Sequence, residues 1–151
     1  MNSFFETLNN LGELTSCAKY FDWLFDEARF DNYSQADLYK ITTTVHKLLE
    51  KSNVKYLPLS KMHMIGYTPN SKSEKVFVFY TNKSACKDFY KHIRNGIAHG
   101  HASVTTKNKE LYITLVDYFD SVKREKRSSY TNISLNLFIS ILQYGLNKGI
   151  K

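Results

Sequence analysis

Apolar residues recur at helical spacing along much of this chain, and this pattern limits its possible folds more than any other feature. Near the N-terminus, Phe21, Leu24, Phe25 and Ala28 follow the i, i+3, i+4, i+7 spacing that places side chains on one face of a helix. The same spacing predicts further helices over about residues 3–11, 34–52 and 132–146, and another that begins at Asn82 or Ser84 and ends near residue 98. The chain is therefore predicted to be mainly α.

Two regions depart from the helical pattern. Residues 76–80 are five β-favouring residues in a row and predict a buried strand. Residues 102–106 and 110–119 flank a short polar turn and predict a β-hairpin. Residues 54–75 contain both prolines and are expected to form a loop, with a short strand near 62–66. The expected architecture is a helical bundle with a small β-hairpin and strand insertion.

Length and charge set the broad class of protein. A chain of 151 residues is most simply one domain spanning 1–151, and 42% hydrophobic residues are enough for a substantial core. The net charge of +7 suggests an anionic partner, with RNA considered first and a membrane surface second. A basic surface without any partner is the alternative interpretation.

Several other classes of protein are disfavoured. Cys17 and Cys86 lie far apart, without a second Cys or His at metal-ligand spacing, so a disulfide framework or zinc site is not expected. The N-terminus lacks a signal-peptide pattern, and no apolar stretch reaches the roughly 20 residues that span a bilayer. The chain is predicted to be cytoplasmic, without a membrane partner, cofactor or metal. No Gly-rich phosphate loop, paired-carboxylate pattern or nucleophile elbow is present.

One short segment combines the groups needed for phosphodiester chemistry. It is Arg94-Asn95-Gly96-Ile97-Ala98-His99-Gly100, followed by His101. Arginine is permanently charged and presents a planar fork of donors that matches phosphate oxygens. Histidine can accept or donate a proton near neutral pH. Cleavage of RNA by its own 2′-hydroxyl needs little more than a positioned cation and a proton-transfer group.

The spacing leaves the acting histidine open. On an unbroken helix, His99 would lie about 140° around the axis from Arg94. One solution is a helix that ends at Ala98, where Gly100 would allow the chain to turn His99 inward. Another is that His101 acts, at position i+7 on the face of Arg94. A two-fold dimer is a third solution, because two motifs would then share one cleft.

The segment Arg94-Asn95-x3-His99-Gly100 resembles the Arg-polar-x-His signature of the HEPN superfamily (higher eukaryotes and prokaryotes nucleotide-binding domains). The predicted hairpin and final apolar helix are similar to those of the small bacterial and plasmid pEK499-p136-like HEPN proteins, over about the last 70 residues. The resemblance implies a helical bundle, a homodimer with the motif helices at its interface, and metal-independent endoribonuclease activity. It also implies a toxin or phage-defence setting, with an antitoxin or other regulatory partner.

The resemblance assigns roles by position. Arg94 corresponds to the family's arginine, Asn95 to its adjacent polar residue and His99 to its histidine. The family's spacing of four to six residues also admits His101. His92, one helical turn before Gly96, is expected at the surface.

A second basic segment could contact RNA. Lys123, Arg124, Lys126 and Arg127 are expected to form an exposed link that could follow an RNA backbone, or only a solvated loop. A non-catalytic HEPN module that binds nucleic acid or nucleotide, or that mediates dimerisation, is the alternative to an endoribonuclease.

Overall fold

The computed structural model describes residues 3–71, 74–120 and 122–149. Over these residues the elements run α1 (Ser3–Asn10), α2 (Leu14–Phe25), α3 (Gln35–Lys51), β1 (Lys55–Leu59), α4 (Lys61–Ile65), β2 (Val76–Tyr80), α5 (Ala85–Ala98), β3 (Ala102–Lys107), β4 (Glu110–Tyr118), β5 (Arg127–Ser134) and α6 (Leu135–Gly149). In this described part, the five strands form one sheet in the order β1-β2-β5-β4-β3. None of its helices is long and apolar enough to cross a membrane.

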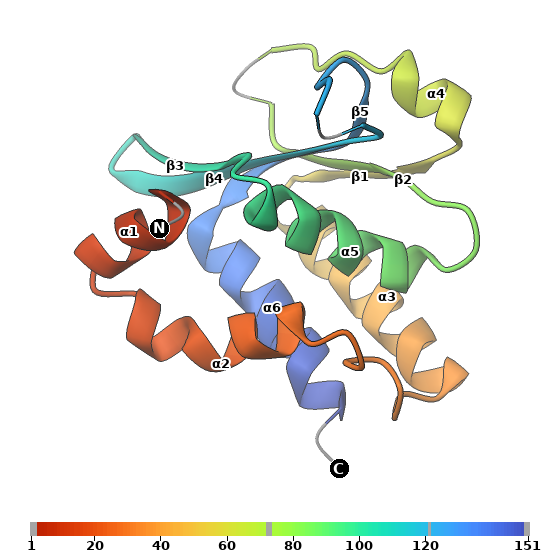
Figure 1. Cartoon of the computed structure of the whole chain (residues 1–151), viewed down its shortest axis with the longest axis horizontal. Coiled ribbons are helices and arrows are strands. Elements are labelled where there is room, and N and C mark those ends of the chain that lie inside the picture. Colours follow the sequence, from red (N-terminus) through yellow and green to blue (C-terminus); the bar gives the residue numbers. More distant parts are fainter. Residues whose placement is uncertain (1–2, 72–73, 121, 150–151) are drawn as a thin grey trace.

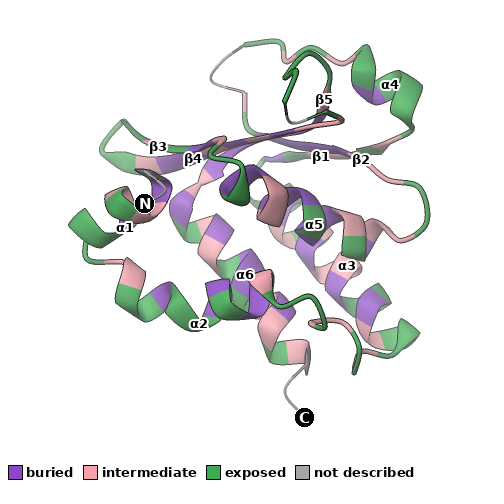
Figure 2. Ribbon diagram, viewed as in Figure 1, coloured by how far each residue is buried: buried purple, intermediate pink, exposed green. Residues whose placement is uncertain are grey.

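The sheet is mixed and is covered unequally on its two faces. Strand β1 pairs with β2 in parallel, whereas the β2–β5, β5–β4 and β4–β3 pairs are antiparallel. The helices α3, α5 and α6 lie on one face with α1 and α2, while the short α4 lies on the other (Figure 1). The larger core fills the space between the sheet and the five helices (Figure 2).

The prediction of a mainly α helical bundle is wrong, because the described residues form an α/β fold around a five-stranded sheet. The unpredicted strands are β1 and β5. β1 contains Pro58, which suggested a loop, but an edge strand tolerates a residue without an N–H donor. β5 contains the end of the predicted charged link and the start of the predicted last helix, which in fact begins at Leu135.

β5 was hard to recognise because its buried positions are mostly polar. Ser128, Ser129, Thr131 and Asn132 are buried, although they carry hydroxyl or amide groups. The amide of Asn132 donates to the carbonyl of Glu74, so this group is satisfied inside the protein. The short strand expected near 62–66 is also wrong, since these residues lie mainly in α4, which Ser60 caps through the backbone N–H of His63.

Local signals located several elements correctly. Ser34 and Asp37 form a capping box at the start of α3, with hydrogen bonds of 3.0 and 3.2 Å. The predicted hairpin is present as β3 and β4, and the turn residues Asn108 and Lys109 both have positive φ. A two-residue turn of this kind matches the twist of the paired strands. Helix α2 ends at Phe25, before the predicted apolar position Ala28.

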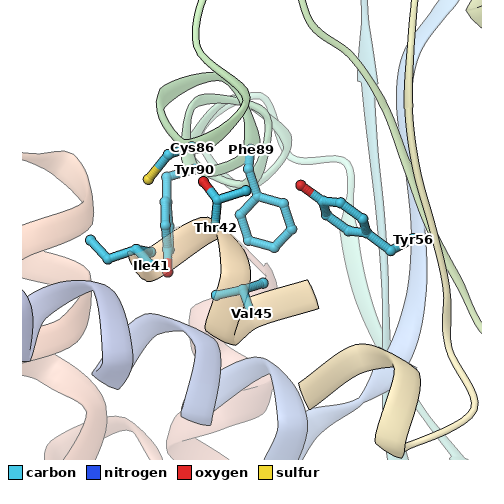
Figure 3. Close-up of a pocket in the computed structure, with 7 residues that line it drawn as sticks. All are labelled: Ile41, Thr42, Val45, Tyr56, Cys86, Phe89 and Tyr90. Atoms are coloured by element: carbon cyan, nitrogen blue, oxygen red, sulfur yellow. The ribbon is translucent and has the colours of Figure 1, made fainter. Parts of the chain in front are cut away.

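The space between α3, α5 and β1 is filled by side chains rather than by a ligand pocket. Tyr56, Cys86, Phe89 and Tyr90 converge there with residues of α3 (Figure 3). Burial raises the pKa of Cys86 to about 11 and that of Tyr56 to about 12, so both groups stay protonated near neutral pH. This region therefore serves packing and is not a binding site.

Candidate functional site

The arginine and histidine motif lies at the C-terminal end of α5, where the chain leaves the helix in a tight cap. Gly100 has φ +76, the backbone N–H of His101 donates to Gly96 at 2.8 Å, and that of Gly100 donates to Ile97 at 3.1 Å. This pair of bonds defines a Schellman cap, as the glycine predicted. Since α5 ends at Ala98, both histidines lie beyond the last helical residue and are freed from the helical spacing.

Gly96 allows this end of α5 to lie close against β4. A β-carbon at Gly96 would come within 3.2 Å of the Leu115 side chain and of the Val116 carbonyl oxygen. The backbone N–H of Val116 in turn donates to the carbonyl of His101 at 3.1 Å. The motif is therefore attached to the sheet, and β4 sets where its side chains stand.

Arg94 is held by a chain of hydrogen bonds that reaches into the sheet. Its Nη1 donates to Oδ1 of Asn95 at 3.1 Å, and Nδ2 of Asn95 donates to Oδ2 of Asp117 at 3.4 Å. The Asp117 carboxylate also lies 2.9 Å from Nδ1 of His92 and accepts from the backbone N–H of Tyr118 at 3.0 Å. The other ring nitrogen of His92 lies 2.7 Å from the carbonyl oxygen of Tyr80.

The prediction that His92 lies at the surface is wrong. Its side chain is 6% exposed and that of Asp117 is 5% exposed. Asp117 follows Ile113 and Leu115 on the face of β4 that packs toward the helices, so its carboxylate points into the protein. An ionisable group at such a position needs a partner, and His92 supplies it.

The two histidines of the motif differ in their surroundings. His99 is exposed, whereas both ring nitrogens of His101 are buried and have no hydrogen-bond partner among the described residues. The ring of His101 packs edge-on against Tyr118 with centroids 5.1 Å apart, and lies 6.3 Å from the ring of His99. Burial lowers the pKa of His101, and the charges of Arg124 and His99 lower it further, against the opposing effect of Asp117.

A second arginine lies in the region of Arg94. The guanidinium of Arg94 is 5.8 Å from the ring centre of Phe25, and Nη1 of Arg29 donates to the carbonyl of the next residue, Asp26, at 3.0 Å. Burial and then the charge of Arg94 lower the pKa of Arg29. The turn after α2 thus places a second cation, Arg29, near Arg94 of the motif.

The predicted RNA-contacting segment is only partly close to the motif. Lys123, Arg124 and Lys126 are exposed in the turn between β4 and β5, and the charge of Arg124 is one of those that lower the pKa of His101 in the motif. Lys123 and Lys126 line a hollow beside Phe119. Arg127 instead begins β5, with its guanidinium 5.4 Å from the ring of Tyr130.

The structure thus joins Arg94 and Asn95 directly and places His99 and His101 side by side. Sequence reasoning missed His92 and Asp117, whose contact spans 25 positions. The sequence held one signal for Asp117, because this aspartate falls at an inward-facing position of the apolar strand β4. In the described part of the chain, no three His, Cys, Asp or Glu side chains form a group that could hold a metal ion.

Comparison with known proteins gives one finding. The family model described as HEPN pEK499 p136 matches residues 6–151, and the chain therefore belongs to this family. Searches of curated proteins and of solved structures found no match.

Proposed function

We propose that this HEPN protein is a metal-independent endoribonuclease, with its active site at the C-terminal end of α5. The single observation that carries the proposal is that the last turn of α5 holds a hydrogen-bonded arginine and that two neighbouring imidazoles follow directly after this helix. Family membership supports a nuclease or nucleotide-binding role, and the net charge of +7 suits a polyanionic substrate.

In the proposed reaction, a histidine accepts the proton of the RNA 2′-hydroxyl, whose oxygen bonds to the adjacent phosphorus. The bond from phosphorus to the 5′-oxygen breaks, and that oxygen takes up a proton. The products are a 2′,3′-cyclic phosphate and a 5′-hydroxyl. Arg94 would stabilise the charge that builds on the phosphoryl oxygens, and Asn95 would hold its guanidinium.

The surroundings of the two histidines suggest a division of roles within this proposal. His101 has a lowered pKa, which favours the neutral imidazole that a base requires. Its ring nitrogens are buried and unpartnered among the described residues, so in this proposal the side chain turns out of its buried position to reach the 2′-hydroxyl. The exposed His99 would then protonate the leaving oxygen. Lys123, Arg124 and Lys126 would contact the RNA backbone beyond the cleaved bond.

The experiment is an RNA cleavage assay in EDTA, with end-group analysis, on wild type and the variants Arg94→Ala, His99→Ala and His101→Ala. We expect wild-type cleavage to survive chelation, and loss of about 100-fold or more in Arg94→Ala and in at least one histidine variant. Full activity in all three variants would contradict the assignment.

The high positive charge also favours a second candidate, a module that binds nucleic acid without cleaving it. Salt-sensitive binding of RNA by folded wild type without any cleavage would select this alternative. The homodimer, the regulatory partner and the toxin or phage-defence setting remain proposals that follow from the family. Sedimentation at high concentration tests the dimer, since a monomer would exclude a site shared between two copies.

A further inference from the structure

We propose that Asp117 is a positioning residue for Arg94, acting through the side-chain amide of Asn95, and that His92 holds Asp117 in place. The inference rests on the proposed function for its effect on catalysis, but the geometry stands without it. No contact between Asp117 and the substrate is involved.

The side-chain amide of Asn95 has one accepting and one donating end. The guanidinium of Arg94 can only donate, and an ionised carboxylate at Asp117 can only accept. With Nη1 of Arg94 at 3.1 Å and Oδ2 of Asp117 at 3.4 Å, only one orientation of the amide satisfies both neighbours. Asp117 therefore determines that Asn95 presents its oxygen to Arg94.

Asp117 is held in place by His92. The imidazole of His92 lies between two acceptors, the carbonyl oxygen of Tyr80 and the carboxylate of Asp117. A proton on each ring nitrogen satisfies both contacts and makes the buried His–Asp pair neutral overall. Because Tyr80 ends β2 and Asp117 is near the end of β4, His92 connects α5 to two strands of the sheet.

The segment of β4 around Asp117 also contacts His101 of the motif. The residues on either side of Asp117 contact His101, through the backbone N–H of Val116 and the ring of Tyr118. One segment of β4 thus contacts both parts of the motif. A shift of about 1 Å in such a support can lower a catalytic rate by about 100-fold.

The substitution Asp117→Asn tests the idea because it keeps the shape and changes one acceptor into a donor. The backbone N–H of Tyr118 donates to Oδ1 and stays a donor, so the new amide keeps its oxygen there and places its NH2 at the Oδ2 position, against Asn95 and Nδ1 of His92. His92 can accept this NH2 through Nδ1 while its Nε2 donates to the carbonyl of Tyr80. Asn95 would then have to rotate and present its own NH2 to Arg94. The double variant Asn95→Asp with Asp117→Asn restores an acceptor for Arg94 and a donor–acceptor pair between positions 95 and 117. The control is Asp88→Asn, at the other end of α5, where the carboxylate accepts from Thr81 and Asn82.

Single-turnover cleavage at saturating RNA is the first readout, with thermal unfolding as a check that each variant is folded. We expect Asp117→Asn to slow cleavage by about 100-fold, the double variant to recover at least tenfold, and the control to stay within about twofold of wild type. A double variant no faster than Asp117→Asn would overturn the proposal.

A second readout separates this proposal from the proposed function. The Nε–Hε resonance of Arg94, assigned with Arg94→Lys, should be sharp in wild type, broadened in Asp117→Asn and sharp again in the double variant. If wild type does not cleave RNA but this pattern is seen, the positioning role stands and only the endoribonuclease assignment fails. An Arg94 resonance that is unchanged in Asp117→Asn would refute the positioning role whatever the activity.

Discussion

The buried pair of His92 and Asp117 should contribute far more to stability than a surface pair of the same chemistry. In Asp117→Ala, the ring Nδ1 of His92 and the backbone N–H of Tyr118 lose their acceptor inside the protein. Removing one partner of a buried ion pair costs about 3–5 kcal/mol in the free energy of unfolding. For a chain of this size, that lowers the melting temperature by roughly 6–20 °C.

The assay is urea unfolding of Asp117→Ala, His92→Ala and the double variant. Because each single change leaves the other group buried without its partner, the double variant should cost less than the sum of the two, by about 1–3 kcal/mol. The matched control is Glu50→Ala, since Glu50 pairs with His46 at 2.8 Å but the side chains of His46 and Glu50 are 46% and 65% exposed. We expect that control to change stability by less than about 1 kcal/mol.

Two results would refute this reasoning. One is a cost below about 1 kcal/mol for both single variants, which would mean that the buried pair is replaced easily by water or by other groups. The other is strict additivity of the two substitutions, which would mean that His92 and Asp117 do not stabilise one another.

Three further predictions concern other parts of the fold. Gly96→Ala should destabilise by about 1–2 kcal/mol, because crowding against the Val116 carbonyl exceeds the gain in helix propensity; a more stable variant in urea unfolding would contradict this. The pKa of His101 in the folded protein is lowered from its ordinary value of 6.5, so as the pH falls the unfolded chain takes up a proton at this residue before the folded protein does. The free energy of unfolding therefore decreases as the pH falls below 6.5. His101→Gln should therefore show a smaller drop in unfolding free energy than wild type between about pH 7.5 and about pH 5. Cys17 and Cys86 are buried with raised pKa values, so a thiol reagent should react slowly with native protein and quickly with both thiols in urea; rapid native reaction would show that the helices open readily.

The sequence predicted those elements whose signals are local. Ser34 and Asp37 lie three residues apart and identify the start of α3, and Gly100 identifies the end of α5 through its positive φ. The hairpin of β3 and β4 is likewise set by neighbouring residues around a short turn. Each of these features depends on contacts within a few positions, which residue type and spacing can reveal.

The strands that were missed depend on distant partners. β5 has few large apolar residues, and it becomes a central strand because β2 and β4 supply hydrogen bonds to both of its sides. β1 lies in a segment with prolines and is recognisable only once β2 is present as a parallel neighbour. The preference of a segment for a strand is therefore decided by tertiary context.

The candidate site likewise combines residues that a local motif marks with residues that only distant contacts bring together. The sequence alone is enough to propose Arg94, Asn95 and the two histidines as candidates, because the motif is short and its chemistry is carried by residue types. Only the tertiary structure decided how these groups are supported, since His92 and Asp117 meet across 25 positions when α5 packs on β4. The physical reason is that hydrogen bonds and burial depend on distance in space, and a linear pattern specifies that distance only within a helix, a turn or a hairpin.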